Sequence, residues 1–510
     1  MRLAFGIAVF MLSLPAFAAA DFDLKLKRGP HAVGMKVLQQ YDYSRVYKPR
    51  NDLFTGAATK GERARPVQTI IWYPAQRGGT PVTHADYLRT SLTEETYNLA
   101  PAEIEQRWSA FLAQHPGAKK GMDAKMWAVR DARPEAGKFP VVVYAPSFNA
   151  SAHENADLCE YLASHGYVVL SSPDMGARGR SMTEDIEGIE AQAADISFLI
   201  SSAHALPQAD TARIAVVGFS WGGISNVFAA AKDDRIRALV SLDGSIRYYP
   251  EFVDGGAKAA SYVTPARVAV PYLFIAAQPK SMEVLNNEKT STGYSFINNM
   301  KYADVYLASM LPMHHADFSA DGLRRSSGDP DAAYSRDEVL VAHSWAMRYV
   351  QQFLNAYLKD DAQALAFLQK PATGNGSPHH MMTIEQRHGK ETPPGFDNLA
   401  LELNTKGYAQ AQAAYQRMRQ LDPGFHPGES QLNMWGYGLQ RSGRAGDAVE
   451  VMKLAVSIYP DSWNLYDSLA EMYEAAGDKA LAVKNYRRSL ELNAGNQNAV
   501  EHLKVLEPQS

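Results

Sequence analysis

Hydrophobic positions in the middle of the chain form continuous runs rather than an alternating pattern. Stretches with helical spacing separate these runs, and a further helix is predicted at about 336–358. The runs are VVVYAPS (141–147), YVVLSSPD (167–174), RIAVVGFS (213–220), ALVSLDG (238–244), PYLFIAAQ (271–278) and DVYLASM (304–310). Strands that are apolar on both sides belong to a parallel sheet that helices cover on both faces. The pattern therefore predicts an α/β fold, with two earlier strands at 34–46 and 65–75.

The last part of the chain shows a helical pattern that repeats. Small residues recur 34 positions apart in three pairs, which are Gly443 and Gly477, Ala448 and Ala482, and Ala455 and Ser489. This period resembles the tetratricopeptide repeat, in which small residues stand where helices cross. A segment around Tyr415 resembles a degenerate third repeat, and about three repeats are needed for a stacked core. The alternative is two amphipathic helical hairpins.

Two polar segments divide the chain further. Residues 85–138 have a mostly helical pattern and are interpreted as an insertion, and residues 370–395 are rich in Gly, Pro and His and are interpreted as a linker. The predicted organisation is a signal peptide (1–20), an α/β domain (21–369), the linker (370–395) and helical repeats (396–510).

The N-terminus has the features of an export signal. Arg2 precedes the apolar run LAFGIAVFMLSLPAFA, and an Ala-x-Ala pattern lies just before Asp21. Such a segment predicts a cleaved signal peptide and a periplasmic or secreted bacterial protein. A membrane anchor is the alternative, but the run is short for a span and contains Ser13 and Pro15. No transmembrane span is therefore expected in the mature chain.

Charge and cysteine content exclude several classes of function. The net charge is −4 and no long basic run occurs, so neither nucleic acid nor an anionic membrane is an expected partner. Cys159 is the single cysteine, which excludes an intramolecular disulfide and favours a packing role. No cofactor or metal is expected.

The stretch GFSWGG (218–223) carries the strongest chemical signal. Ser220 stands in a Gly-x-Ser-x-Gly pattern between a predicted strand and a predicted helix. That context is typical of a nucleophile elbow, where glycines allow a sharp bend and the helix N-terminus points at the serine. Ser220 is the candidate nucleophile, and a packing turn is the alternative.

A nucleophilic serine needs a histidine base and an acid that orients it. Only His314 and His315 follow a strand directly within the α/β region, and His343 lies in a helical pattern. A metal site at the histidine pair is the alternative, but no cysteine or carboxylate set supports it. Asp243 ends a predicted strand and is the candidate acid, and Glu283 is the reserve.

Residues 30–325 resemble the platelet-activating-factor acetylhydrolase branch of the α/β-hydrolases, relatives of dienelactone hydrolase. The matching segments are GPHAVG, ARPVQTIIWYPA, KFPVVVYAPSFNAS, EYLASHGYVVLSSPD, GFSWGG, ALVSLDGSIRYYP and HHADF. The resemblance implies a nucleophile at Ser220, an acid at Asp243 and a base at His315, with His314 as the alternative. It also implies an oxyanion hole of two backbone amides, at Trp221 and near Phe148. The family often has His-Gly in the second loop, where this chain has Pro146-Ser147.

These features together predict an α/β-hydrolase fold followed by tetratricopeptide-like repeats. The expected function is hydrolysis of a small-molecule or lipid-like ester through an acyl-enzyme. A peptidase or amidase with the same triad is one alternative. Another is an interaction protein that acts mainly through its repeats, which are expected to bind a protein partner.

Overall fold

The computed structural model describes residues 22–507, except 23, 53, 280–294, 327, 329–331 and 391. The predicted signal peptide lies outside the described residues. The chain divides into two compact units, Met1–Gly389 and Lys390–Ser510, and each is described by itself. Among the residues that the structure describes, no helix combines the length and the apolar character needed to span a bilayer.

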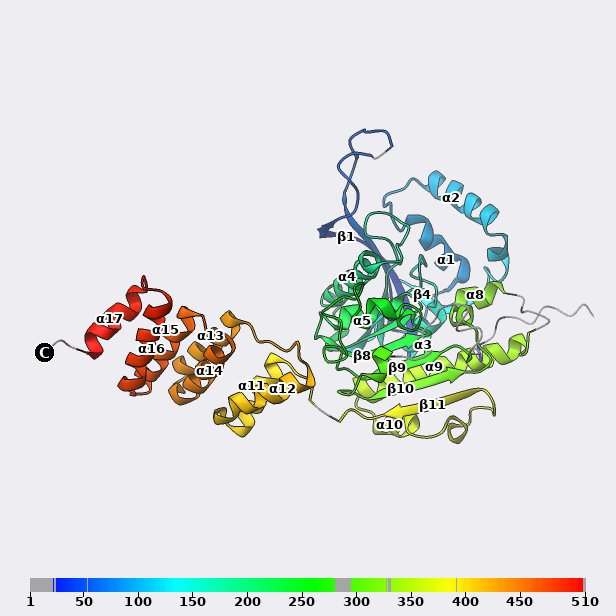
Figure 1. Ribbon diagram of the computed structural model, residues 1–510. Helices are drawn as coiled ribbons and strands as arrows, with labels where there is room; N and C mark the ends of the chain where they lie inside the picture. The colour runs from blue at the N-terminus through cyan, green and yellow to red at the C-terminus, as the bar shows by residue number, and fades with distance from the viewer. Residues whose placement is uncertain are drawn as a thin grey trace, which may run out of the picture. The chain divides into compact units, whose positions relative to one another are not determined.

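The first unit is built on one sheet, whose described strands lie in the order β11-β10-β9-β8-β7-β5-β6-β2-β1-β4-β3 (Figure 1). Strands β6, β5, β7, β8, β9 and β10 pair in parallel, and β2, β1 and β11 join antiparallel to their inner neighbours. The bounds are β1 (Ala32–Val46), β2 (Ala64–Ala75), β3 (Pro81–Thr83), β4 (Lys125–Arg130), β5 (Phe139–Ala145), β6 (Val168–Ser171), β7 (Ala209–Phe219), β8 (Ile236–Leu242), β9 (Tyr272–Ala276), β10 (Val305–Met310) and β11 (Met382–Arg387).

Helices cover both faces of this sheet. Helices α3 (Ala156–Ser164) and α9 (Arg336–Leu358) pack with Val142 and Tyr144 on one face, and α4 (Ile186–Ala203) and α5 (Gly222–Ala230) pack with Val141 and Val143 on the other. Both sides of β5 are therefore buried, which explains its continuous apolar run. The α/β prediction is confirmed. The remaining described helices of this unit are α1 (His84–Leu88), α2 (Pro101–Gln114), α7 (Ser295–Asn298), α8 (Ala320–Arg325) and α10 (Ala362–Leu368).

Two segment predictions need correction. Residues 370–395 are not simply a linker, because β11 lies within them and pairs with β10 as the edge strand of the sheet. β11 is an edge strand, and only its first residue, Met382, is buried. Polar residues therefore dominate it, and its sequence pattern resembles that of a loop. The 85–138 segment includes α2 and most of α1, in keeping with its mostly helical pattern, but it also includes β4, which pairs in parallel with β1.

The second unit is all-helical. Its described helices are α11 (Phe396–Lys406), α12 (Ala411–Leu421), α13 (Glu429–Arg441), α14 (Ala445–Ile458), α15 (Trp463–Ala475), α16 (Lys479–Leu492) and α17 (Gln497–Leu506). Gly443 and Gly477 follow α13 and α15 with φ of +81° and +85°, the left-handed conformation that ends many helices. Ala448 and Ala482 are fully buried at matching places in α14 and α16. The 34-residue period is thus structural, and the assignment to the tetratricopeptide family stays a prediction.

Candidate active site

Ser220 occupies a tight turn between β7 and α5. Its φ is +52°, a left-handed conformation that costs a non-glycine residue about 1–3 kcal/mol. Glycine is needed on both sides of the bend because there is no space for a side chain. A Cβ on Gly218 would lie 2.0 Å from the Gly222 carbonyl oxygen, and a Cβ on Gly222 would lie 2.1 Å from the Ala145 carbonyl oxygen. The Ser220 N–H donates to Leu242, and its carbonyl accepts from Gly223 and Ser245. The backbone at Ser220 is therefore fixed on all sides.

Ser220, His315 and Asp243 form one hydrogen-bonded series. The Ser220 Oγ lies 2.8 Å from His315 Nε2, and His315 Nδ1 lies 2.6 Å from Asp243 Oδ2. The three residues follow β7, β10 and β8, so the carboxyl ends of parallel strands bring them together. Ser220 is half-buried and the His315 side chain is 41% exposed.

Asp243 is completely buried and accepts several hydrogen bonds. Its Oδ1 accepts from the Ala277 N–H at 3.0 Å, and its Oδ2 accepts from the Tyr248 hydroxyl at 2.7 Å as well as from His315. The Arg247 guanidinium lies 3.6 Å from Oδ1. Burial raises the pKa of Asp243, but the hydrogen bonds and the charge of His315 outweigh it, and the pKa stays below its usual range. The carboxyl is therefore held as an anion.

The loop that carries His315 is held from two helices. His315 opens a short 3-10 turn, His315–Phe318. His343 of α9 bonds the Asp317 carbonyl through Nδ1 at 2.8 Å, and Asn155 donates to the Phe318 carbonyl at 2.9 Å. The adjacent His314 side chain is 64% exposed and lies 3.5 Å from Asp317. The structure therefore brings His315, and not His314, to Ser220.

The two residues expected to supply oxyanion amides lie side by side. The rings of Phe148 and Trp221 meet edge to face with centroids 5.4 Å apart. Neither the Phe148 N–H nor the Trp221 N–H donates to an acceptor within the part of the chain that the structure describes. Trp221 directly precedes α5, whose N-terminus adds positive potential beside Ser220.

Sequence reasoning missed several supporting side chains. Tyr248 was not assigned to the site, and its hydroxyl donates to Asp243. His343 and Asn155 come from helices whose patterns give no sign of a site. Glu283, the reserve acid, lies outside the described residues. Within those residues no group of three or more His, Cys, Asp or Glu side chains is placed to hold a metal ion.

The chain is similar to several known proteins. Residues 123–376 match the family model described as X-Pro dipeptidyl-peptidase (S15 family). A protein provisionally named carboxymethylenebutenolidase, from Methylorubrum extorquens, is 26% identical over 136 residues, which are 24% of this chain and 46% of the relative. The match thus spans less than half of that relative. A ferulic acid esterase from Streptomyces cinnamoneus superposes with a TM-score of 0.47 and 20% identity, over 71% of this chain and 98% of its own.

The fold and the family match together indicate a hydrolase with an α/β-hydrolase fold. The predicted resemblance is confirmed at that level. Its platelet-activating-factor acetylhydrolase branch stays a prediction.

Proposed function

We propose that the first unit hydrolyses carboxylic esters through an acyl-enzyme at Ser220. The observation that carries this proposal is the series Ser220–His315–Asp243 at the carboxyl ends of three parallel strands. A serine hydroxyl is activated for acyl transfer when it is hydrogen-bonded to an imidazole that is in turn hydrogen-bonded to a buried carboxylate anion.

In this mechanism His315 takes the proton of Ser220 as its Oγ attacks the ester carbonyl. Asp243 holds the ring orientation and stabilises the imidazolium that forms. The N–H groups of Trp221 and Phe148 bind the oxyanion, and one such donor contributes about 10²–10³ in rate. His315 then protonates the leaving alcohol, and afterwards it activates the water that releases the acid.

A peptidase or amidase is the second candidate, and the match to the X-Pro dipeptidyl-peptidase family favours it. The same triad acts on amides. We place the ester first because an alcohol leaves more readily than an amine, and so demands less of the general acid.

The test compares Ser220→Ala and His315→Ala with the unaltered protein on p-nitrophenyl acetate, butyrate and octanoate, and on alanyl-prolyl-p-nitroanilide. The two variants should lose about 10⁴-fold or more in kcat. His314→Ala is the matched control and should keep near-normal turnover. Faster turnover of the anilide than of any ester would favour the peptidase, and full activity in Ser220→Ala would overturn both proposals.

Two further parts of the proposal concern the rest of the chain. We propose that the protein is exported after cleavage near Ala20, which N-terminal sequencing of the mature protein would test. We also propose that the second unit binds a protein partner, because helical repeat arrays present extended surfaces. Removal of residues 390–510 should abolish that binding and leave ester turnover intact.

A further inference from the structure

The turn Ser147–Ala150 fixes the peptide that carries the second proposed oxyanion donor. The Ala150 N–H donates to the Ser147 carbonyl at 2.9 Å, and Asn149 has a φ of +59°. A positive φ at the third position is the mark of a type II turn, in which asparagine is tolerated. Because a trans peptide directs its N–H opposite to its carbonyl, the bond at the Ser147 carbonyl also sets the direction of the Phe148 N–H.

One buried carboxyl holds the residue that precedes Phe148. Glu154, which is 8% exposed, accepts from the Ser147 N–H at 2.9 Å and from the Ser147 hydroxyl. The Tyr144 hydroxyl donates to the same carboxyl at 3.1 Å. Glu154 therefore bonds both polar groups of Ser147 that the turn itself leaves free.

A second buried carboxyl holds the residue that follows Phe148. Asp174, which is fully buried, accepts from the Asn149 N–H at 2.8 Å. The Asn149 side-chain oxygen accepts from Met182 at 2.7 Å, and its carbonyl accepts from Arg180 at 3.1 Å. The left-handed conformation of Asn149 is thus held by three contacts from the 174–182 segment.

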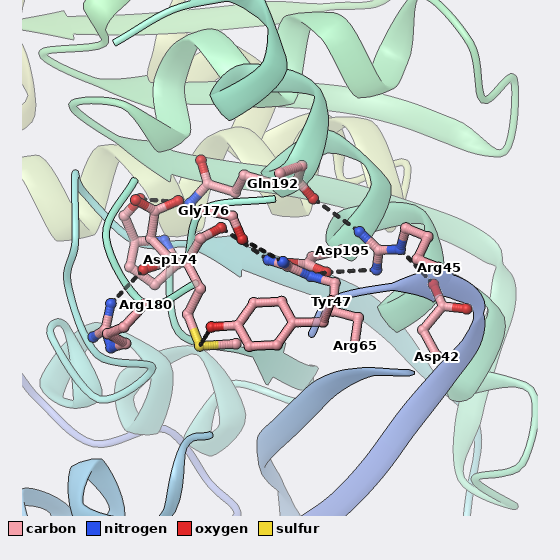
Figure 2. A network of polar contacts seen from close by, with 12 residues as sticks. Asp42, Arg45, Tyr47, Arg65, Asp174, Gly176, Arg180, Gln192 and Asp195 are labelled. Carbon is pink, nitrogen blue, oxygen red and sulfur yellow. Dashed lines mark hydrogen bonds and ion pairs between the residues drawn. The ribbon is translucent and has the colours of Figure 1, made fainter. Parts of the chain in front are cut away.

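The 174–182 segment is itself anchored to the sheet by a buried ion pair (Figure 2). Arg65 of β2 donates to the Met175 and Gly176 carbonyls at 2.9 and 2.6 Å and binds both oxygens of Asp195 in α4. One turn earlier in α4, Gln192 donates to the Pro146 carbonyl at 2.8 Å. The turn is therefore fixed to two elements of the core, β2 and α4.

We propose that Glu154 and Asp174 are positioning residues of the reaction: they clamp the residues on either side of Phe148 and so aim its N–H at the oxyanion. The inference rests on the proposed function. Neither carboxyl touches the substrate, and both act through the backbone of the turn. A backbone donor that is misplaced by about 1 Å costs on the order of 10²-fold in rate.

The matched control is Glu160, a buried carboxyl of α3 with a similar set of donors. It is 1% exposed and accepts from the Tyr87 hydroxyl and from the N–H groups of Trp127 and Ala128, at 2.7, 2.7 and 3.1 Å. These partners lie in β4 and α1, away from the turn. Replacement of Glu160 therefore reproduces the structural damage of losing such a carboxyl without moving the Phe148 N–H.

The experiment measures kcat and KM on p-nitrophenyl acetate, and the affinity for a trifluoromethyl ketone that forms a tetrahedral adduct with the serine. Glu154→Leu and Asp174→Leu should lower kcat about 10²-fold and leave KM nearly unchanged. They should also lower the affinity for the ketone by a similar factor. Glu154→Gln keeps one acceptor oxygen for the Ser147 N–H and should recover most of the lost kcat. Glu160→Leu should lose stability but keep kcat.

Each other outcome counts against the inference. Equal kcat in Glu154→Leu and Glu160→Leu would overturn it and leave the proposed function standing, provided that Ser220→Ala is inactive. An active Ser220→Ala would overturn the proposed function itself. If the leucine variants do not fold, Ser147→Ala removes one of the two hydrogen bonds between Ser147 and Glu154. It should lower kcat and ketone affinity together, and a change in KM alone would contradict the inference.

Discussion

The two turns that meet at the candidate site reach their geometry by different routes. The Ser220 turn depends on its own glycines, because backbone oxygens lie where a Cβ on Gly218 or Gly222 would stand. The Ser147–Ala150 turn has no glycine and is held by two carboxyls outside it, Glu154 four residues after the turn and Asp174 further along the chain. Both turns contain a residue with positive φ.

The two kinds of turn leave different signals in the sequence. A turn shaped by its own glycines leaves a short motif in the sequence, which can be recognised without a structure. A turn held by carboxyls outside it leaves no such motif, because its stability depends on whether those carboxyls are buried and directed at the turn, which the sequence does not show. The first kind of turn should lose its geometry when a methyl group is added to a glycine, and the second when a carboxyl outside the turn is removed.

The largest effect is expected from a methyl group in the Ser220 turn. Gly222→Ala places a Cβ 2.1 Å from the Ala145 carbonyl oxygen, so α5 must move away from the end of β5. Trp221 moves with α5 while Phe148 stays with β5, and the two proposed donors separate. We expect kcat to fall about 10²–10³-fold and the free energy of unfolding to fall by about 1–3 kcal/mol.

Gly438→Ala in α13 is the control for that substitution, measured by ester kinetics and urea unfolding. Apart from its chain neighbours and the backbone of α13 itself, no atom lies within 4 Å of a Cβ at Gly438. Alanine should therefore stabilise the helix by about 0.5–1 kcal/mol and leave kcat unchanged. Full turnover in Gly222→Ala would show that the close approach of α5 to β5 is not needed.

A smaller effect is expected at Asn149 in the second turn. Asn149→Ala strains the left-handed backbone and removes the bond from the Met182 N–H, whereas Asn149→Gly keeps the conformation. We expect about tenfold lower kcat in the alanine variant, since a positioning error of this kind is partial, and a milder loss in the glycine variant.

Asn98 offers the comparison for this pair. It has nearly the same φ, +61°, but it is exposed and belongs to the 85–138 segment. Asn98→Ala should therefore lower the Tm, because alanine strains the left-handed backbone, without changing kcat. Equal kinetics for alanine at positions 149 and 98 would mean that the second turn has no role in the reaction.

The same distinction explains how much the sequence could predict. Ser220, Asp243 and His315 each follow a strong apolar strand, and the structure places all three in one series. β11 was missed because an edge strand with polar residues resembles a loop. Glu154 and Tyr248 were missed although their partners, Ser147 and Asp243, lie only seven and five residues away. No sequence pattern shows whether such a carboxyl or hydroxyl is buried against its neighbour or faces solvent.

The smallest effect on turnover is expected from the pH response of the buried carboxyls. Burial raises the pKa of Glu160, like that of Glu154, from 4.5 to about 7. Between these two pH values the folded protein retains a proton that the unfolded chain has released. The stability that each carboxyl contributes is therefore present below about pH 4.5 and is lost as the pH rises to 7. A change from 4.5 to about 7 corresponds to about 3 kcal/mol.

Glutamine at either position removes this titration, so the stability of wild type relative to the variant should fall by about that amount between pH 4.5 and 7. Urea unfolding across this range measures it, and the difference between proteins cancels the titration of other groups. Both variants should show a similar change in stability because burial raises the pKa of each carboxyl to about 7. Only Glu154→Gln should also alter kcat, since only Glu154 bonds the turn that carries Phe148. A kcat effect of equal size at Glu160 would mean that buried carboxyls influence the site through stability alone, and the contrast between the two turns would then lose its functional meaning.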